Sequence, residues 1–305
     1  MIALWLAASA HATWSVVATD AATSQVGGAG TSCVGTFNVG IIFAAAPGIG
    51  AVHAQAAVST RGRDRAAEIL AKGGTPDDAI TEISSEAFDT SAAARQYGVV
   101  DVFGNAAAFT GGDNGDWAGD LQGTDGTYTF SAQGNILTNA EVVTRTHAAF
   151  SNVGGCDLAE RLIVSLAAGS VPSEGDSRCT PELPSDSAFI RVLDASGEVY
   201  LDLSVVDTAP DDPLVLLRAA FDDWRVDNPC DTPPTGSTGD TGAPTTTPGT
   251  GPGPNPTEPG NPTDDTGSPA PVSEDGGCGC GHTGTGAPWI GAVLLLSIFR
   301  RSRGR

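Results

Sequence analysis

Thr13 is placed to become the first residue of a processed chain, where a threonine can act as a nucleophile. The residues before it, Ala10-His11-Ala12, fit the small-x-small pattern of signal peptidase sites and follow an apolar stretch. Cleavage after Ala12 would give Thr13 a free α-amine, whose pKa of about 7.7–8.0 leaves a useful neutral fraction near pH 7. That amine could remove the proton from the Thr13 hydroxyl, which is a poor nucleophile until a base activates it.

Two simpler interpretations stand beside this one. Thr13 could merely begin a β-strand, which its propensity already explains. The stretch before it could be a buried first strand beginning near Ile2, since the apolar run is short and no positively charged residue precedes it.

Four other residues could complete an acyl-transfer site. Gly134 and Asn135 follow a predicted strand, and the Gly134 amide and the Asn135 side chain are candidate donors to an oxyanion. Asp176 and Arg178 could form an ion pair that orients the amine or a substrate carboxylate. The alternatives are an ordinary glycine turn and a surface salt bridge of little energetic consequence.

No cofactor is predicted, since the sequence contains no Walker loop, dinucleotide fingerprint or HExxH motif. His53 lies in an apolar stretch and is interpreted as a core histidine. Four acidic residues lie in one glycine-rich loop but lack EF-hand spacing, so we expect a solvated loop and no metal there; they are Asp113, Asp116, Asp120 and Asp125.

The six cysteines predict disulfides and therefore an oxidising compartment. We expect Cys156 to pair with Cys179 and, as a weaker prediction, Cys33 with Cys230. Their spacing fits no zinc motif of the C-x-x-C…C-x-x-C kind.

The net charge of −21 excludes nucleic acid as a partner, because phosphate binding requires clustered Lys and Arg. Only 15 basic residues are present, and four of them lie among the last six residues of the sequence. The simplest meaning of this charge is solubility.

Composition divides the sequence into four parts. Residues 1–12 are interpreted as a signal peptide whose start could lie further upstream, and residues 13–230 as a globular domain. Residues 231–277 hold 11 of the 20 prolines and no Lys or Arg, which predicts a disordered linker. Residues 278–305 contain Cys278 and Cys280, then the apolar run APWIGAVLLLSIF and an arginine-rich end. As a helix this run would span only about 20 Å of a hydrocarbon core about 30 Å thick.

This tail resembles the C-terminal sorting signals of myxobacterial surface proteins, in which the cysteine region is the place of processing and anchoring. The resemblance rests on Cys278-Gly279-Cys280-Gly281 followed by the apolar run and the basic end. It implies that the tail engages the membrane or a sorting machinery. An ordinary short transmembrane anchor is the alternative.

The hydrophobic periodicity predicts strands and helices in separate groups, which favours an α+β fold with antiparallel sheets. A four-layer αββα sandwich accommodates this order. We expect strands over 13–20, 25–34, 40–45, 51–58, 97–102, 106–110, 128–132, 188–193 and 199–203. We expect helices over 63–72, 75–87, 140–150, 157–168 and 211–224, and a loop over 111–126.

Eight short runs in order resemble the family known as domain of unknown function 1028. They are TWSVVATD at Thr13, QAAV at Gln55, RQYGVVD at Arg95, AFTG at Ala108, WAG at Trp117, QGNIL at Gln133, LAERL at Leu158 and GDSR at Gly175. The resemblance covers residues 13–225 and implies a fold of the N-terminal-nucleophile hydrolase type. Members commonly continue Gly-Asp-x-Arg with Gly-x-Gln-Ser-Ala, whereas here Cys179 and an insertion follow.

The sequence therefore predicts an exported amidohydrolase-like protein of the cell surface or outer envelope. Its substrate would be an amide bond in peptide or peptidoglycan material, attacked by Thr13. The alternative is a non-catalytic binding module displayed on the surface by the linker.

Overall fold

The computed structural model describes residues 12–230. In this part the strands are β1 (Thr13–Asp20), β2 (Gln25–Ser32), β3 (Phe43–Ala46), β4 (Gly50–Ala56), β5 (Arg95–Asp101), β6 (Ala106–Thr110), β7 (Gly119–Asp125), β8 (Tyr128–Asn135), β9 (Ser187–Leu193) and β10 (Val199–Val205). The α-helices are α1 (Thr60–Ala71), α2 (Pro76–Ile83), α3 (Glu141–Asn152), α4 (Leu158–Ala168) and α5 (Pro213–Asp227). Short 3-10 turns span Val39–Ile42 (η1) and Ala92–Ala94 (η2).

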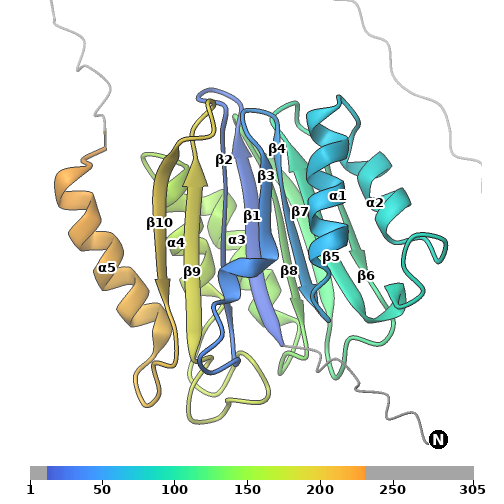
Figure 1. Ribbon diagram of the computed structural model, residues 1–305. Helices are drawn as coiled ribbons and strands as arrows, with labels where there is room; N and C mark the ends of the chain where they lie inside the picture. Colours follow the sequence, from blue (N-terminus) through green and yellow to red (C-terminus); the bar gives the residue numbers. More distant parts are fainter. Residues whose placement is uncertain (1–11, 231–305) are drawn as a thin grey trace, which may run out of the picture. The chain divides into compact units, whose positions relative to one another are not determined.

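The described strands form two antiparallel sheets (Figure 1). One has the order β10-β9-β2-β1-β8-β7, and the other has the order β3-β4-β5-β6. Strand β1 lies inside the larger sheet, where Thr13 is opposite Ser32 of β2 and Asn135 of β8. The mixed α and β content and the antiparallel pairing confirm the predicted α+β class.

Helices α3, α4 and α5 pack on the larger sheet, and α1 and α2 pack on the smaller one. The side chains of β1 alternate between the two faces of the larger sheet, so they contact both layers. Trp14, Val16 and Ala18 share one buried cluster with residues of α3, α4 and α5. Val17, on the other face of β1, shares a cluster with Ala51 and Val100 of the smaller sheet. Helices α1 and α2 pack against that smaller sheet (Figure 1).

Local sequence signals set the helix boundaries. Ser59 caps α1, and Thr75 begins α2 with a reciprocal capping box to Asp78, so the predicted start at Thr75-Pro76 is confirmed. Helix α2 ends at Ile83, before the predicted end near residue 87. Asp157 caps the amino end of α4 through the Glu160 amide.

Two predicted elements were wrong. The strand expected over 40–45 is the turn η1 followed by β3, because the Asn38 side chain accepts from the Gly40 amide and begins a 3-10 turn. The loop expected over 111–126 contains β7, which pairs with β8 along its whole length. Strand β7 is at the edge of its sheet and contains no buried residue, so it lacks the apolar alternation that reveals buried strands.

Several predictions concern parts of the sequence outside the described residues. The signal peptide up to residue 11, the linker over 231–277 and the tail over 278–305 are among them. Across residues 12–230, no helix combines the length and the apolar character that crossing a membrane would require.

We expect Gly28→Ala to destabilise the fold by about 1–3 kcal/mol through overpacking. A Cβ at Gly28 of β2 would lie 2.2 Å from Nε2 of the buried His53. Urea unfolding of the variant measures this cost. Gly112→Ala is the matched control, since a Cβ there meets no atom within 4 Å. Equal stability of the two variants would contradict the packing described.

Candidate functional site

Thr13 lies buried at the start of β1, with 2% of its surface exposed. Its hydroxyl Oγ1 donates to Ser32 Oγ at 3.2 Å, across the β1–β2 pair. Ser32 Oγ in turn donates to the carbonyl oxygen of Ala12. A short chain of hydrogen bonds therefore links the Thr13 hydroxyl to the peptide bond immediately before it.

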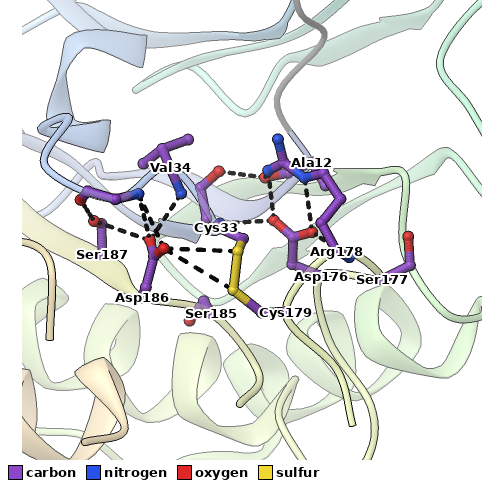
Figure 2. Close-up of a disulfide and its surroundings, with 12 residues drawn as sticks. Ala12, Cys33, Val34, Asp176, Ser177, Arg178, Cys179, Ser185, Asp186 and Ser187 are labelled. Carbon is purple, nitrogen blue, oxygen red and sulfur yellow. Dashed lines mark hydrogen bonds and ion pairs between the residues drawn. A yellow bond between two sulfur atoms is a disulfide. The ribbon is translucent and has the colours of Figure 1, made fainter. Parts of the chain in front are cut away.

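The Ala12 carbonyl has a second donor, the guanidinium of Arg178. Arg178 Nη2 lies 3.1 Å from the Ala12 oxygen (Figure 2). The structure thus brings Arg178 to the Ala12–Thr13 junction, although 165 residues separate Thr13 from it in sequence. Two donors on one carbonyl oxygen are the arrangement that stabilises negative charge during acyl transfer.

Asp176 holds Arg178 in place from a fully buried position. Its carboxylate accepts from Arg178 Nη2 at 2.7 Å and from Arg178 Nε at 3.1 Å, and it also accepts the Cys33 amide at 2.6 Å. Burial raises the pKa of the Asp176 carboxyl, and the hydrogen bonds from Arg178 oppose this shift. Asp176 therefore joins the end of β2 to the loop that carries Arg178.

A disulfide between Cys33 and Cys179 lies directly beside this ion pair (Figure 2). The predicted partners Cys156 with Cys179 and Cys33 with Cys230 were therefore wrong. Asp176, bonded to the Cys33 amide, positions the loop that carries Cys179, and the Cα atoms of Cys33 and Cys179 are 5.9 Å apart.

The second disulfide joins Cys156 to Cys230. Arg225 of α5 forms two hydrogen bonds with the Asp157 carboxylate, which brings the end of α5 to the start of α4. Two disulfides are typical of proteins in an oxidising compartment, which is consistent with export.

Carboxylates lie near the sulfur atoms of both disulfides. Asp186 Oδ2 is 3.6 Å from Cys33 Sγ, and Asp157 is close to the second pair. Asp186 also accepts from the amides of Val34 and Gly35 at 2.7 and 3.0 Å, which fixes the turn after β2. Because the sulfur atoms are bonded to each other, neither group offers thiolates to a metal.

Two acidic residues of the 111–126 segment, Asp120 and Asp125, have separate partners. Asp120 accepts a hydrogen bond from Thr110 Oγ1, and Asp125 pairs with Arg161 at 2.5 Å. These two carboxylates therefore bind β6 and α4, respectively.

Asn135 lies opposite Thr13 and belongs to a buried network of amide side chains. Asn135 Nδ2 donates to Gln96 Oε1 at 3.1 Å and, more weakly, to the Thr13 carbonyl at 3.5 Å. Gln96 Nε2 donates to the carbonyls of Gly119 and Gly134 at 3.1 and 2.8 Å. Because backbone carbonyls only accept hydrogen bonds, the atom of Gln96 that faces them must be Nε2, and Oε1 must face Asn135. The atom of Asn135 that faces Gln96 Oε1 must then be Nδ2. Asn135 Oδ1 is buried and has no hydrogen-bond partner among the described residues.

Gly134 contributes its backbone and the absence of a side chain. Its carbonyl accepts from Gln96, and a Cβ at this position would lie 2.3 Å from Leu137 Cδ1. The close packing of Leu137 against β8 therefore requires glycine here.

The network continues away from Thr13 towards His53. Gln55 Nε2 donates to the Thr13 carbonyl at 3.2 Å, and Gln55 Oε1 accepts from Ser15 Oγ at 2.6 Å. Ser15 has then used its hydrogen, so His53 Nδ1, 2.9 Å away, donates to it and Nε2 is unprotonated. Burial lowers the pKa of His53 to about 3 and keeps the ring neutral.

Sequence reasoning missed Ser32, Gln55 and Gln96. Ser32 ends a strand of small residues and carries no recognisable motif. The two glutamines do carry a signal, because each stands within a strand whose other residues are mostly apolar and buried. A buried polar side chain in such a strand requires partners, and here the partners surround Thr13.

A narrow apolar pocket opens beside Thr13. Its lining includes Ser32, Val34, Phe37, Ile41 and Val58. Its volume of about 10 Å³ is close to what one water molecule needs.

The sequence model of one protein family, described as a family of unknown function (DUF1028), matches residues 13–217. The chain belongs to this family. The match begins at Thr13, the residue that the site surrounds. Among curated proteins, no sequence matches this DUF1028 chain.

A crystal structure from Silicibacter pomeroyi, of a protein assigned to the same family, has a similar fold. The TM-score is 0.59 at 27% sequence identity, over 70% of this chain and 86% of the other. The resemblance seen in the eight sequence runs is therefore confirmed at the level of the DUF1028 family.

We expect the stability of the protein to fall as the pH is lowered from 6.5 towards 3. The unfolded chain can protonate His53 at its ordinary pKa of 6.5, whereas the folded chain resists protonation down to about 3. The loss from this residue is at most about 1.4 kcal/mol per pH unit. Urea unfolding at several pH values, compared with His53→Asn, measures it.

His53→Asn should flatten the dependence between pH 6.5 and 4, whatever its effect at pH 7. The partly exposed His147 provides the matched control, and His147→Asn should retain the slope. An unchanged slope in His53→Asn would refute the neutral buried histidine.

Proposed function

We propose that this protein is an exported amidohydrolase in which Thr13 is the nucleophile once residues 1–12 are removed. In this proposal the two sheets and their helices form a four-layer αββα sandwich of the N-terminal-nucleophile hydrolase type. The observation that carries it is the Ala12 carbonyl, held by Ser32 Oγ and Arg178 Nη2 beside the Thr13 hydroxyl.

Removal of Ala12 would leave the same two donors beside a new α-amine. A substrate amide could then place its carbonyl oxygen where the Ala12 oxygen lies, within reach of the donors that bind it in the uncleaved chain. Thr13 Oγ would attack the carbonyl carbon while the α-amine takes the hydroxyl proton. The amine then passes the proton to the leaving nitrogen, and water hydrolyses the acyl ester.

Asn135 and Gly134 take supporting roles in this mechanism. Both hydrogens of Asn135 Nδ2 are already donated, so its unpartnered Oδ1 is better suited to accept from the α-ammonium of Thr13 than to stabilise an oxyanion. The Gly134 amide remains a candidate oxyanion donor. Asp176 keeps Arg178 aimed at the carbonyl oxygen.

The two disulfides support export, since such pairs persist outside the reducing cytosol. The proline-rich stretch and the cysteine-containing tail would display the domain at the cell surface or outer envelope, with the tail engaging the membrane or sorting machinery. Peptide or peptidoglycan fragments are the substrates proposed for this location. They supply the amide bonds that the mechanism requires.

The exported protein should have a mass that corresponds to a first residue of Thr13. An electrophile that traps N-terminal threonine should then label it stoichiometrically, and Thr13→Ala should abolish the label because the attacking hydroxyl is absent. Intact-mass measurement before and after labelling reports both steps.

Thr13→Ser should keep the label, and Thr23→Ala, in the turn after β1, should leave it unchanged. A mature chain that begins at another residue would rule out the mechanism. Equal labelling of the original protein and Thr13→Ala would favour a binding module.

A further inference from the structure

A second, larger hollow adjoins the narrow pocket at Thr13. It has a volume of about 530 Å³, within the range of small-molecule sites. Phe37 and Ile41 line both spaces, so the two spaces share part of their walls. The rest of its lining includes Asn38, Phe43, Arg63 and Arg191.

The charged residues that line the hollow are two arginines. Arg63 comes from α1 and Arg191 from β9, and no Asp or Glu is among the lining residues. Two arginines from separate elements therefore converge on one space. Each guanidinium also contacts a carboxylate outside the lining, Asp64 or Asp202, so the lining presents hydrogen-bond donors. A guanidinium matches a carboxylate in shape.

Both arginines are partly fixed before any ligand binds. Arg63 Nη1 donates to the Ile41 carbonyl, and its Nε and Nη2 contact Asp64 at 2.7 Å. Arg191 Nη2 donates to Asp202 at 2.7 Å, whereas its buried Nε has no hydrogen-bond partner among the described residues. A buried donor without a partner is costly, and a ligand oxygen would remove that cost.

We propose that the hollow formed by Phe37, Arg63 and Arg191 binds the carboxylate of the substrate, so that the protein acts on amides bearing a free carboxylate. This inference rests on the proposed function of Thr13. Short peptides are the matching chemical class, because Arg191 lies opposite Gly28 at the register of Val17, four residues along β1 from Thr13. Their apolar side chains would contact Phe37 and Ile41, and their carboxylate would bind the two guanidinium groups.

The test compares two probes that differ only in charge, N-acetyl-L-phenylalanine and its uncharged carboxamide. Binding is measured by calorimetric titration of the exported protein carrying Thr13→Ala, after mass measurement has shown that residues 1–12 are removed, and no turnover occurs in this variant. The carboxylate should bind at least about tenfold more tightly than the amide, which is the preference that one charged hydrogen bond supplies. Arg63→Gln and Arg191→Gln should each reduce this ratio towards one.

Lys72→Gln is the matched control, because it removes one positive charge from the exposed end of α1 outside the hollow. It should keep the full ratio. The inference is overturned if the two probes bind equally, if neither binds, or if both arginine variants keep the preference. Titration needs no catalysis, so an absent Thr13 label with an intact ratio would refute the nucleophile alone and leave the carboxylate site standing.

Discussion

Strand β1 is hydrogen-bonded on both sides, and this double pairing is the constraint on which the site depends. Because β2 and β8 fix the register of β1, Thr13 must lie between Ser32 and Asn135. The strand then alternates between an apolar face towards α3 and α4 and a second face towards the smaller sheet. Thr13 and Ser15 lie on that second face, where Gln55 bonds both of them.

Because this polar face is buried, each of its polar groups needs a hydrogen-bond partner. A hydrogen bond lost in a buried region costs the full desolvation of the group left behind, so the network is stable only when nearly complete. Asp176 is also buried, and its negative charge needs a partner for the same reason. Its ion pair with Arg178 is weak support for stability, since desolvation offsets the attraction, but it determines where the guanidinium points. These polar groups therefore determine the positions of the side chains around Thr13 more than they stabilise the fold.

The sequence predicted most of what periodicity and capping can encode. The alternation in β1 and the Thr75-Pro76 signal led to correct elements, because each depends on neighbours in the chain. The edge strand β7, the cysteine partners and the roles of Ser32 and Gln96 were missed. Each depends on residues that approach one another only in the folded chain, and four cysteines alone allow three connectivities. Asp176 and Arg178 were identified as a pair, but their contact with Ala12 required the structure.

The two disulfides also determine what happens when the backbone is cut. Cys33–Cys179 closes a loop across 146 residues, and Cys156–Cys230 closes another across 74, with an overlap between Cys156 and Cys179. Any single cut between Cys33 and Cys230 therefore falls within at least one ring, and both fragments stay covalently joined. Within residues 12–230, a cut before Cys33 falls outside both rings. In an environment rich in proteases, the domain can thus be nicked between Cys33 and Cys230 without coming apart, whereas the Ala12–Thr13 bond lies outside both rings.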